Sequence, residues 1–306
     1  MNKSITLNSG HKIPTIGIGT WEAKPAAIGL TLRHAILNAG YTHIDCAKAY
    51  GNEKEVGNAL KEIFSSGQVK REDLFITSKL WNTDHHPDMV EEACRQTLHD
   101  LQLEYLDLYL IHWGIAFASG EGIAPFDKSG RIKTQAVSIQ ATWQAMEKLV
   151  EKGLVKSIGV ANFTNAMMID LLTYAKIQPA MSQVEIHPYN SQVDLIKYCH
   201  QEGVAVTAYS PLGRGGVRSG DLMLLEDPAV EKIAKSHQKT PAQVVLNWAI
   251  GRGTVAIPKS VSPARIDENI AIFDFSLTDE EQSQINALNQ NHRFVNPTDW
   301  GISYFA

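Results

Sequence analysis

Short apolar runs alternate with helical patterns along most of this chain, and few folds are compatible with that arrangement. The apolar runs lie near residues 16–19, 42–45, 74–79, 107–111, 157–160, 181–185, 204–208 and 254–257. Buried parallel strands joined by helices give this pattern, because a helix returns the chain to the same end of the sheet between strands. Eight strands with eight crossovers favour a closed barrel over an open doubly wound sheet. We therefore expect residues 1–306 to form a single (β/α)8 TIM-barrel domain.

The helical patterns between these runs carry recognisable start signals. They lie near residues 25–39, 53–65, 88–101, 138–152, 165–175, 192–202, 228–237, 241–251 and 263–270. Asp227, Thr240 and Ser262 each precede a proline, which predicts a capping side chain at three of these starts. Thr278 and Glu281 have capping-box spacing and predict an extra helix near 279–288. Two short runs, 5–7 and 12–14, predict an N-terminal hairpin.

Composition limits the compartment and the partners that we expect. The formal net charge of −5 argues against nucleic acid or an anionic membrane as a partner. No apolar core of signal-peptide length opens the chain, and no apolar stretch is long enough to span a bilayer. The three cysteines are odd in number and far apart, which fits a reducing compartment. We expect a cytoplasmic protein, and the sequence leaves monomer and homodimer equally open.

Four polar residues lie at or just after the ends of three apolar runs. Asp45 ends one run and Tyr50 follows it by five residues, Lys79 ends the next run, and His112 follows the third. A (β/α)8 barrel carries its chemistry at the C-terminal ends of its strands. A strand-end aspartate is usually a turn residue and a lone tyrosine usually packs at a surface, but their joint placement favours a shared site. An aspartate, a tyrosine, a lysine and a histidine together suit proton delivery to a carbonyl.

The residue types suggest a role for each member. Tyrosine is a poor acid near pH 7, because its ordinary pKa is about 10. We expect Lys79 to lower the pKa of Tyr50 by about 1–3 units, since a nearby cation favours the phenolate. Asp45 would hold Lys79 in place, and His112 would donate a hydrogen bond to the substrate oxygen. Tyr50 is then predicted to be the acid in carbonyl reduction and the base in the reverse reaction.

Two competing interpretations have less support. Tyr50 and Lys54 match the Tyr-x-x-x-Lys pair of short-chain dehydrogenases, but residues 17–22 lack the third glycine of the phosphate loop that those enzymes need. We therefore expect Lys54 to lie on a helix surface. Residues 85–86 and 185–187 offer histidines and a glutamate, but without the spacing of a metal motif. No metal is expected.

Three segments resemble signatures of the aldo-keto reductase family. They are residues 43–53, residues 106–113 and the cofactor signature over 257–269, and they occur in the family's order. The similarity covers essentially the whole chain. It implies an (α/β)8 barrel with NADPH lying across its C-terminal mouth. Within the family, the chain resembles the xylose and aldose reductases and the plant hexose-6-phosphate reductases most.

The resemblance also assigns site residues. Asp45, Tyr50, Lys79 and His112 match the family's catalytic tetrad. Cofactor contacts are matched by Thr20, Trp21, Asn162, Gln183, Tyr209, Ser210, Leu212, Lys259, Ser260, Arg265, Glu268 and Asn269. By this resemblance Tyr209 stacks on the nicotinamide, and the two amides hold its carboxamide. The cationic pair Lys259 and Arg265 matches the site of the adenosine 2′-phosphate, which favours NADPH over NADH.

Resemblance also suggests a substrate class. Trp21, Trp81 and Trp113 match the aromatic walls of the substrate pocket, beside His112. Residues 67–82, 115–117 and 300–306 resemble sugar reductases, so we expect reduction of an aldose or aldose phosphate. The cations that could meet a phosphate are Lys48, Lys128, Arg131, Arg214, Arg218 and Arg293. A general aldehyde or ketone reductase of detoxification type, a steroid or prostaglandin reductase and a non-catalytic NADPH-binding redox sensor remain alternatives.

Several positions depart from the family pattern or have no pattern at all. Ala161 precedes Asn162 where the family commonly has serine, which removes one carboxamide contact. Ala49 replaces an acid of the yeast xylose reductases, which argues against a pentose. Residues 213–220 are rich in glycine and predict a mobile strap over the cofactor. Residues 113–135 form the longest segment without periodicity, and we expect a functional loop there.

Overall fold

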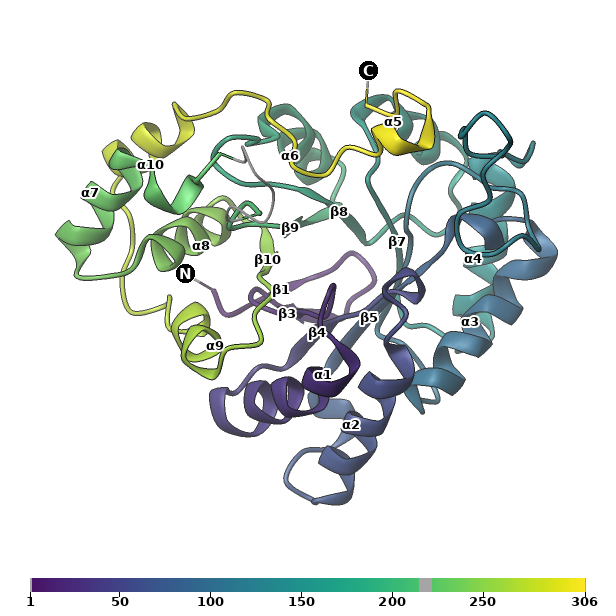
Figure 1. The fold of residues 1–306 in the computed structure, drawn as a ribbon, viewed down its shortest axis with the longest axis horizontal. Helices are drawn as coiled ribbons and strands as arrows, with labels where there is room; N and C mark the ends of the chain where they lie inside the picture. The colour runs from purple at the N-terminus through teal and green to yellow at the C-terminus, as the bar shows by residue number, and fades with distance from the viewer. Residues whose placement is uncertain (1, 215–221, 306) are drawn as a thin grey trace.

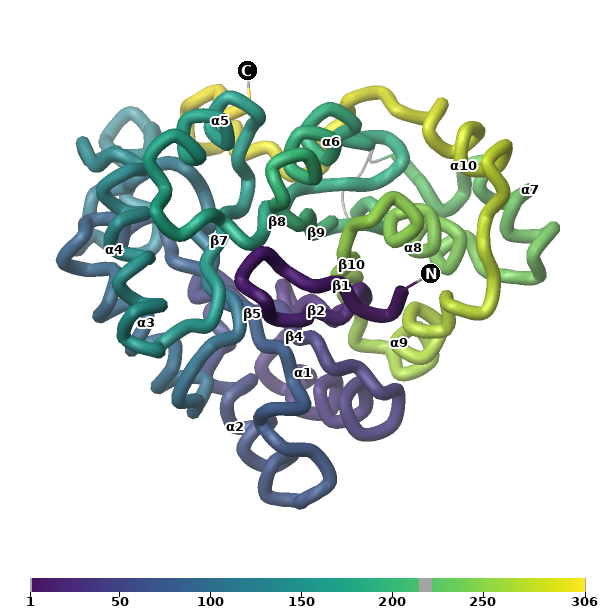
Figure 2. The backbone as a smooth tube through the Cα atoms, turned by 180° about the vertical axis from the view of Figure 1, so that it is seen from behind, coloured from purple at the N-terminus to yellow at the C-terminus, as the bar shows by residue number. Residues whose placement is uncertain are grey.

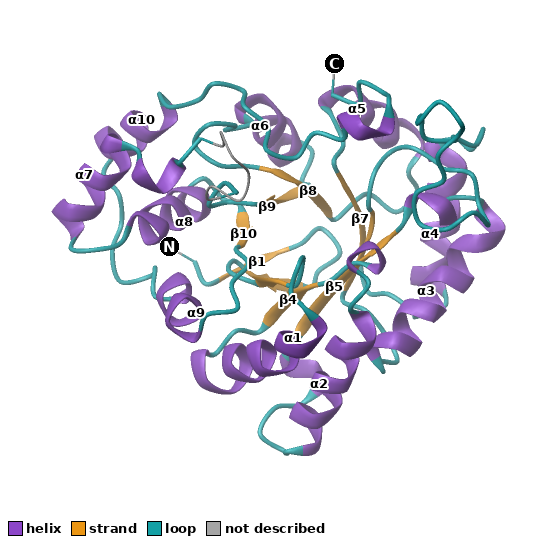
Figure 3. Cartoon of the chain, viewed as in Figure 1, coloured by secondary structure: helices purple, strands orange, loops and turns teal. Residues whose placement is uncertain are grey.

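Eight parallel strands form the centre of the computed structural model, and helices surround them (Figures 1 and 3). The structure describes residues 2–214 and 222–305. Its barrel strands are β3 (Ile18–Gly19), β4 (His43–Asp45), β5 (Phe75–Leu80), β6 (Leu108–Ile111), β7 (Ile158–Ala161), β8 (Met181–Glu185), β9 (Ala205–Tyr209) and β10 (Val255–Ile257). They neighbour one another in chain order, and a parallel bridge from Ile16 to Ala256 joins the first to the last. The predicted (β/α)8 barrel is confirmed, with strand bounds within two residues of those expected.

The helices also follow the prediction closely. They are α1 (Pro25–Arg33), α2 (Glu53–Ser65), α3 (Pro87–Leu101), α4 (Ile139–Glu151), α5 (Asn165–Tyr174), α6 (Val193–Gln201), α7 (Pro228–His237), α8 (Pro241–Gly251), α9 (Pro263–Ile270) and α10 (Asp279–Asn286). The stretch expected near 25–39 changes from α1 to a π-helix over His34–Ala39 and ends at Gly40, whose φ is +83°. None of the helices in residues 2–214 and 222–305 is long and apolar enough to cross a membrane.

Most of the predicted helix caps are present. The side chains of Asp227 and Thr240 accept backbone N–H groups at the starts of α7 and α8, and the capping box at Thr278 begins α10. The predicted cap at Ser262 is wrong, because its side chain makes no capping hydrogen bond. The hydroxyl of Ser260 holds this turn instead by accepting the Ser262 N–H at 3.1 Å. Ser262 lies on the wall of the cavity described below.

Alternation along each strand divides the buried residues into two layers. Inward residues such as Phe75, Leu108 and Met181 pack inside the barrel, whereas neighbours such as Ile76 pack outward against the helices. The hairpin of β1 (Ser4–Thr6) and β2 (Lys12–Pro14) lies across the N-terminal end, seen in purple in Figure 2. Ile13 of this hairpin is completely buried against the inner layer. One end of the barrel is therefore sealed with apolar side chains, which leaves the C-terminal end for polar groups.

Candidate active site

A cavity of about 970 Å³ opens at the C-terminal ends of the strands. Nearly every residue that the sequence assigned to a site lines it. Those residues are Trp21, Asp45, Tyr50, Trp81, His112, Trp113, Asn162, Gln183, Tyr209, Ser210, Leu212, Lys259, Ser260, Arg265, Glu268 and Asn269. Lys79 and Thr20 do not line it. Lys79 is buried behind Asp45 and Tyr50, and the Thr20 hydroxyl donates to the Asp45 carbonyl at 2.9 Å.

Lys79 connects two other members of the predicted proton-transfer group, Asp45 and Tyr50. Its Nζ donates to Asp45 Oδ1 at 2.5 Å, to the Cys46 carbonyl at 2.9 Å and to the Tyr50 hydroxyl at 3.1 Å. Three acceptors use all three hydrogens of a charged ammonium. Residues that are 34 positions apart in the chain thus form one hydrogen-bonded unit, because β4 and β5 are neighbours in the barrel. This is the arrangement that the sequence predicted for Asp45 and Lys79.

Burial decides the protonation of this unit. Desolvation by itself lowers the pKa of Lys79, but the Asp45 carboxylate outweighs it and the net pKa of Lys79 is raised. For Tyr50 the order is reversed. Desolvation raises the pKa of Tyr50 to about 12, although Lys79 lowers it. The prediction that Lys79 would bring this pKa below its ordinary value is therefore wrong, because the phenolate would lose more solvation than one cation returns.

His112 lies next to Tyr50 and is uncharged. Its ring centroid is 6.0 Å from that of Tyr50 and 5.2 Å from that of Trp81. Burial, then the charge of Lys79, lower the pKa of His112 well below its usual range. Its Nδ1 is buried without a hydrogen-bond partner among the described residues. The neutral ring therefore presents Nε2 as the nitrogen available at the cavity.

Two amides and a tyrosine lie beside this group. Asn162 donates to the His112 carbonyl at 2.9 Å and accepts the Tyr209 hydroxyl at 2.7 Å. Gln183 donates to Asp45 Oδ2 at 2.8 Å. Each amide nitrogen has a second hydrogen, so both side chains can still donate to a ligand in the cavity.

The cavity also carries cationic side chains. Lys259 and Arg265 line it and are exposed to solvent. Neither side chain forms an ion pair with a carboxylate in the part of the chain that the structure describes. Glu268 lies beside them and accepts the Thr240 hydroxyl at 2.7 Å, so its carboxylate is held at the start of α8. Two cations without acidic partners form a suitable site for a phosphate.

Sequence reasoning missed one wall of the cavity. Residues 294–300 contribute side chains to it, among them Phe294 and Trp300. Trp300 packs at 5.0 Å from Trp113 and 6.5 Å from Trp81, measured between ring centroids. The fully buried carboxylate of Glu185 holds this segment by accepting the N–H groups of residues 294 and 295, at 2.7 and 3.1 Å. The resemblance of residues 300–306 to sugar reductases pointed to the end of this segment, but it did not show which strand end the segment would meet.

The predicted phosphate-binding cations are mostly elsewhere. Of the five that the structure describes, Arg214 alone lines the cavity, and its guanidinium lies 4.7 Å from the Trp21 ring centroid. Lys48 is paired with Asp84 at 2.7 Å. Arg293 lies over the ring of Phe305. Arg218 and most of the glycine-rich strap predicted over 213–220 lie outside the described residues.

The loop over residues 113–135 supports the wall instead of lining it. Apart from Trp113, its members stay outside the cavity. The Ile123 carbonyl accepts the Trp81 indole N–H at 2.6 Å, and Phe117 packs against Trp81 and Trp300. The expected functional loop therefore acts on the cavity through the tryptophans that it holds.

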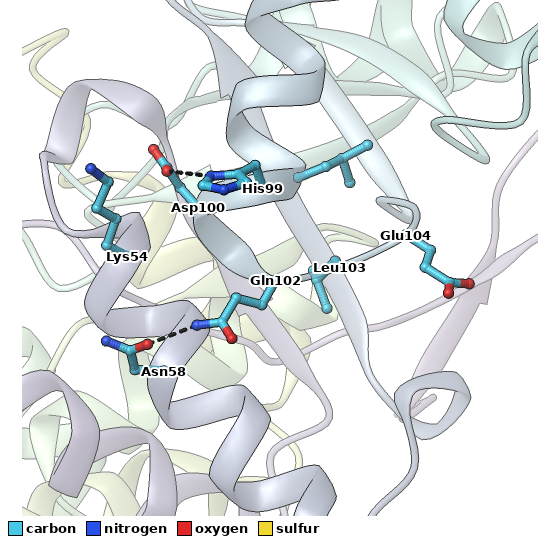
Figure 4. Close-up of a pocket in the computed structure, with 8 residues that line it drawn as sticks. Lys54, Asn58, His99, Asp100, Gln102, Leu103 and Glu104 are labelled. Atoms are coloured by element: carbon cyan, nitrogen blue, oxygen red, sulfur yellow. Dashed lines mark hydrogen bonds and ion pairs between the residues drawn. The ribbon is translucent and has the colours of Figure 1, made fainter.

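The lysine of the rejected Tyr-x-x-x-Lys motif lies outside the barrel mouth. Lys54 is exposed on α2 and borders a shallow groove between α2 and the end of α3, together with Asn58 and Gln102 (Figure 4). The Gln102 amide donates to Asn58 Oδ1 at 2.7 Å across this groove. The expectation of a helix-surface lysine is confirmed. Within residues 2–214 and 222–305, no three His, Cys, Asp or Glu side chains are grouped as metal ligands.

Glu53 is a buried acid just behind the site. Its carboxyl accepts hydroxyl hydrogen bonds from Ser78 at 2.5 Å and Thr97 at 3.1 Å. Desolvation raises the pKa of Glu53 to about 7 despite these two bonds. Asp100 on α3 raises it further and Lys79 on β5 lowers it. The folded protein therefore holds a proton here at pH values where an exposed glutamate has lost it.

We expect the stabilisation associated with protonated Glu53 to be lost as the pH rises. The folded pKa is above the ordinary value of 4.5, so the contribution is complete below pH 4.5 and disappears on passing pH 7. Glu53→Gln does not titrate and serves as the reference. Between pH 5 and 8, the unfolding free energy of the wild type should fall by about 3 kcal/mol relative to this variant in urea denaturation. A difference that stays constant with pH would contradict the prediction.

A parallel barrel with an aspartate, lysine, tyrosine and histidine around a cavity at its strand ends has the architecture of a barrel enzyme. Known proteins narrow this class. The model of the Aldo/keto reductase family matches residues 15–290. The chain therefore belongs to the aldo/keto reductase family, and aldehyde reduction is the class of reaction to which it is assigned.

The similarity to individual relatives extends over nearly the whole chain. Over 302 residues the chain is 51% identical to aldo-keto reductase family 1 member A1-A of Danio rerio, covering 97% of this chain and 93% of that protein. It is 49% identical over 298 residues to aldo-keto reductase family 1 member A1 of Mus musculus, covering 96% and 91%. The structure of the aldose reductase from Schistosoma japonicum is similar with a TM-score of 0.93 and 42% identity, covering 99% of this chain and 98% of that one.

Proposed function

We propose that this protein reduces aldehydes to alcohols with NADPH, with Tyr50 as the proton donor. The observation that carries the proposal is the hydrogen bond from buried Lys79 to the Tyr50 hydroxyl, which lies on the cavity wall beside neutral His112. A proton donor, its charge partner and a second hydrogen-bond donor are what a carbonyl oxygen needs to become a hydroxyl. A positioned donor of this kind contributes about 10²–10⁴-fold to the rate.

The residues that line the cavity suit a nicotinamide dinucleotide phosphate. The free hydrogens of Asn162 and Gln183 suit a carboxamide, and Tyr209 lines the cavity next to them. Lys259 and Arg265, which also line the cavity, would hold the 2′-phosphate of the adenosine. When bound, the reduced cofactor supplies the hydride for the carbonyl carbon. Because the amides of Asn162 and Gln183 would fix the carboxamide, one face of the nicotinamide ring would meet the substrate. The hydrogen on that face would then be the one transferred.

The chain's own residues then manage the proton. The raised pKa keeps Tyr50 protonated through the neutral range, so that it is ready to donate to the carbonyl oxygen. When the proton leaves, the Lys79 ammonium already lies 3.1 Å from the new tyrosinate oxygen and stabilises it. Asp45 holds the ammonium at 2.5 Å throughout. Neutral His112 would orient the carbonyl by donating from Nε2.

The walls indicate which aldehydes fit. Four tryptophans line the cavity: Trp21, Trp81, Trp113 and Trp300. Indole rings stack against sugar C–H faces and also bury apolar chains, so aldoses and small aromatic aldehydes are both proposed as substrates. Only one of the described candidate cations, Arg214, would be available for a substrate phosphate. The structure thus gives more support to aldehydes without phosphate than to an aldose phosphate.

The test is the initial rate of NADPH oxidation against xylose, glucose, glucose 6-phosphate, mannose 6-phosphate, glyceraldehyde and an aromatic aldehyde. We expect turnover of the uncharged aldehydes, with kcat/KM for glucose 6-phosphate and for mannose 6-phosphate no higher than for glucose. A clear preference for sugar phosphates would show that Arg214 or residues outside the described part recognise the phosphate. Tight NADPH binding without turnover of any of these aldehydes would refute the proposal in favour of a redox sensor.

A further inference from the structure

The segment that carries Tyr50 is held from several directions. It forms a short 3-10 helix, Lys48–Tyr50, between β4 and α2. On one side the Asn52 amide donates to the Thr20 carbonyl at 2.9 Å. On another side Lys48 is paired with Asp84 at 2.7 Å. Since the segment has little regular structure of its own, these side-chain bonds fix where the tyrosine lies.

Glu53 also holds this segment, and its carboxyl is bonded to two other elements at once. It is the first residue of α2, and its side chain is 5% exposed. The hydroxyl groups of Ser78 and Thr97 both donate to its carboxyl. One side chain therefore connects three elements: the helix that follows Tyr50, strand β5 and helix α3.

The position of Ser78 makes this connection relevant to the chemistry. Ser78 directly precedes Lys79 in β5, so their side chains point to opposite faces of the barrel wall. Lys79 points inward, where its Nζ must contact Asp45 and Tyr50 at the same time. Glu53 therefore lies on the outer side of the strand, where it cannot touch a substrate, yet it is bonded to the residue next to Lys79.

We propose that Glu53 is a positioning residue for proton transfer: it fixes the Tyr50 segment and the Lys79 strand relative to each other through one buried carboxyl. The inference rests on the proposed function, in which Tyr50 is the acid. A buried carboxyl costs more free energy than an apolar side chain of the same size would. A residue that only filled space could be apolar and would avoid this cost. A residue that holds two hydroxyl groups on two elements must be a hydrogen-bond acceptor. Small displacements of reacting groups, on the order of 1 Å, lower rates by about 10²-fold.

The test compares Glu53→Ala with Glu147→Ala as a matched control. Glu147 is also buried, at 6% exposure, and its carboxyl accepts two bonds, from the N–H groups of Lys176 and Ile177 at 2.7 and 2.9 Å. It lies on α4 and does not line the cavity. Both variants should lose thermal stability. Only Glu53→Ala should lower the single-turnover rate of aldehyde reduction, by about tenfold or more, with KM and NADPH affinity nearly unchanged.

Rescue distinguishes positioning from general destabilisation. Glu53→Gln keeps an acceptor oxygen for Ser78 and a polar group for Thr97, so it should recover most of the single-turnover rate. Ser78→Ala removes one of the two bonds with little change in volume and should lower the rate in the same direction, even if Glu53→Ala does not fold. A wild-type rate in folded Glu53→Ala, or an equal loss in Glu147→Ala, would overturn the proposal. If Glu53→Ala does not fold, a wild-type rate in Ser78→Ala, or a loss in Glu147→Ala equal to that in Ser78→Ala, would overturn the proposal.

Failure of the proposed function gives a different result. If Tyr50→Phe kept the wild-type rate, the assignment of the acid would be refuted, and the positioning role would fall with it. If Tyr50→Phe were inactive and Glu53→Ala fully active, only the positioning role would be refuted. Measuring the wild type, Tyr50→Phe and Glu53→Ala in one series separates these outcomes.

Discussion

Tyr50→Phe is expected to lower kcat for aldehyde reduction by at least about 10²-fold while NADPH affinity stays nearly unchanged. The substitution removes the hydroxyl that accepts from Lys79 and keeps the ring on the cavity wall. The carbonyl oxygen then has no positioned acid, and water must supply the proton. Cofactor contacts are proposed elsewhere in the cavity, so binding measured by fluorescence titration should not change.

Tyr189→Phe is the matched control for this experiment. Tyr189 is also largely buried, and its hydroxyl donates to Asp227 at 2.9 Å without lining the cavity. Loss of that hydroxyl should affect stability and leave kcat unchanged. Activity retained in Tyr50→Phe would remove the tyrosine from the mechanism and leave His112 as the nearest alternative donor.

The double variant Lys259→Ala with Arg265→Ala should weaken NADPH binding by about 10–100-fold and leave NADH binding nearly unchanged. Both cations line the cavity, and neither is neutralised by a carboxylate in the described part of the chain. A 2′-phosphate is the only group that distinguishes the two cofactors. Dissociation constants for both cofactors, measured at one salt concentration, give the comparison.

A second double variant controls for the loss of two positive charges. Lys54→Ala with Lys61→Ala removes two exposed lysines of α2 that do not line the cavity. It should leave the affinities for both cofactors unchanged, since these exposed charges lie outside the cavity and are screened by solvent and salt. Equal weakening of NADPH and NADH by the first pair would place the 2′-phosphate site elsewhere.

The proposed proton-donating centre shows how burial can oppose a nearby charge. Lys79 lowers the pKa of Tyr50, but desolvation raises it more, and the balance keeps the tyrosine protonated. This suits a donor, because the group must carry its proton until the carbonyl oxygen develops negative charge. The cation then offsets the tyrosinate that forms. Neither contribution is visible from residue types alone, since both depend on the solvent that the fold excludes.

Much of the architecture could be predicted because the signals are local. Eight apolar runs and the helices between them predicted the barrel, since strand and helix periodicity arises from near neighbours in the chain. Asp45, Lys79 and His112 were predicted to share a site because parallel strands place their C-terminal ends at one rim. The cap at Ser262 failed because a local signal was met by another local group, the Ser260 hydroxyl.

The sequence was sufficient to predict most of the candidate residues that line the mouth of the barrel, whereas their charges and contacts depend on the tertiary structure. The pKa of Tyr50, the link from Glu53 to Ser78 and the anchoring of residues 294–300 by Glu185 depend on groups brought together from distant positions. Burial and long-range contact set these properties, and no pattern within a short window records them. The position of residues at strand ends predicted where the candidate site lies. Packing around that site sets the protonation states of its side chains and adds Trp300 as a fourth tryptophan on the cavity wall.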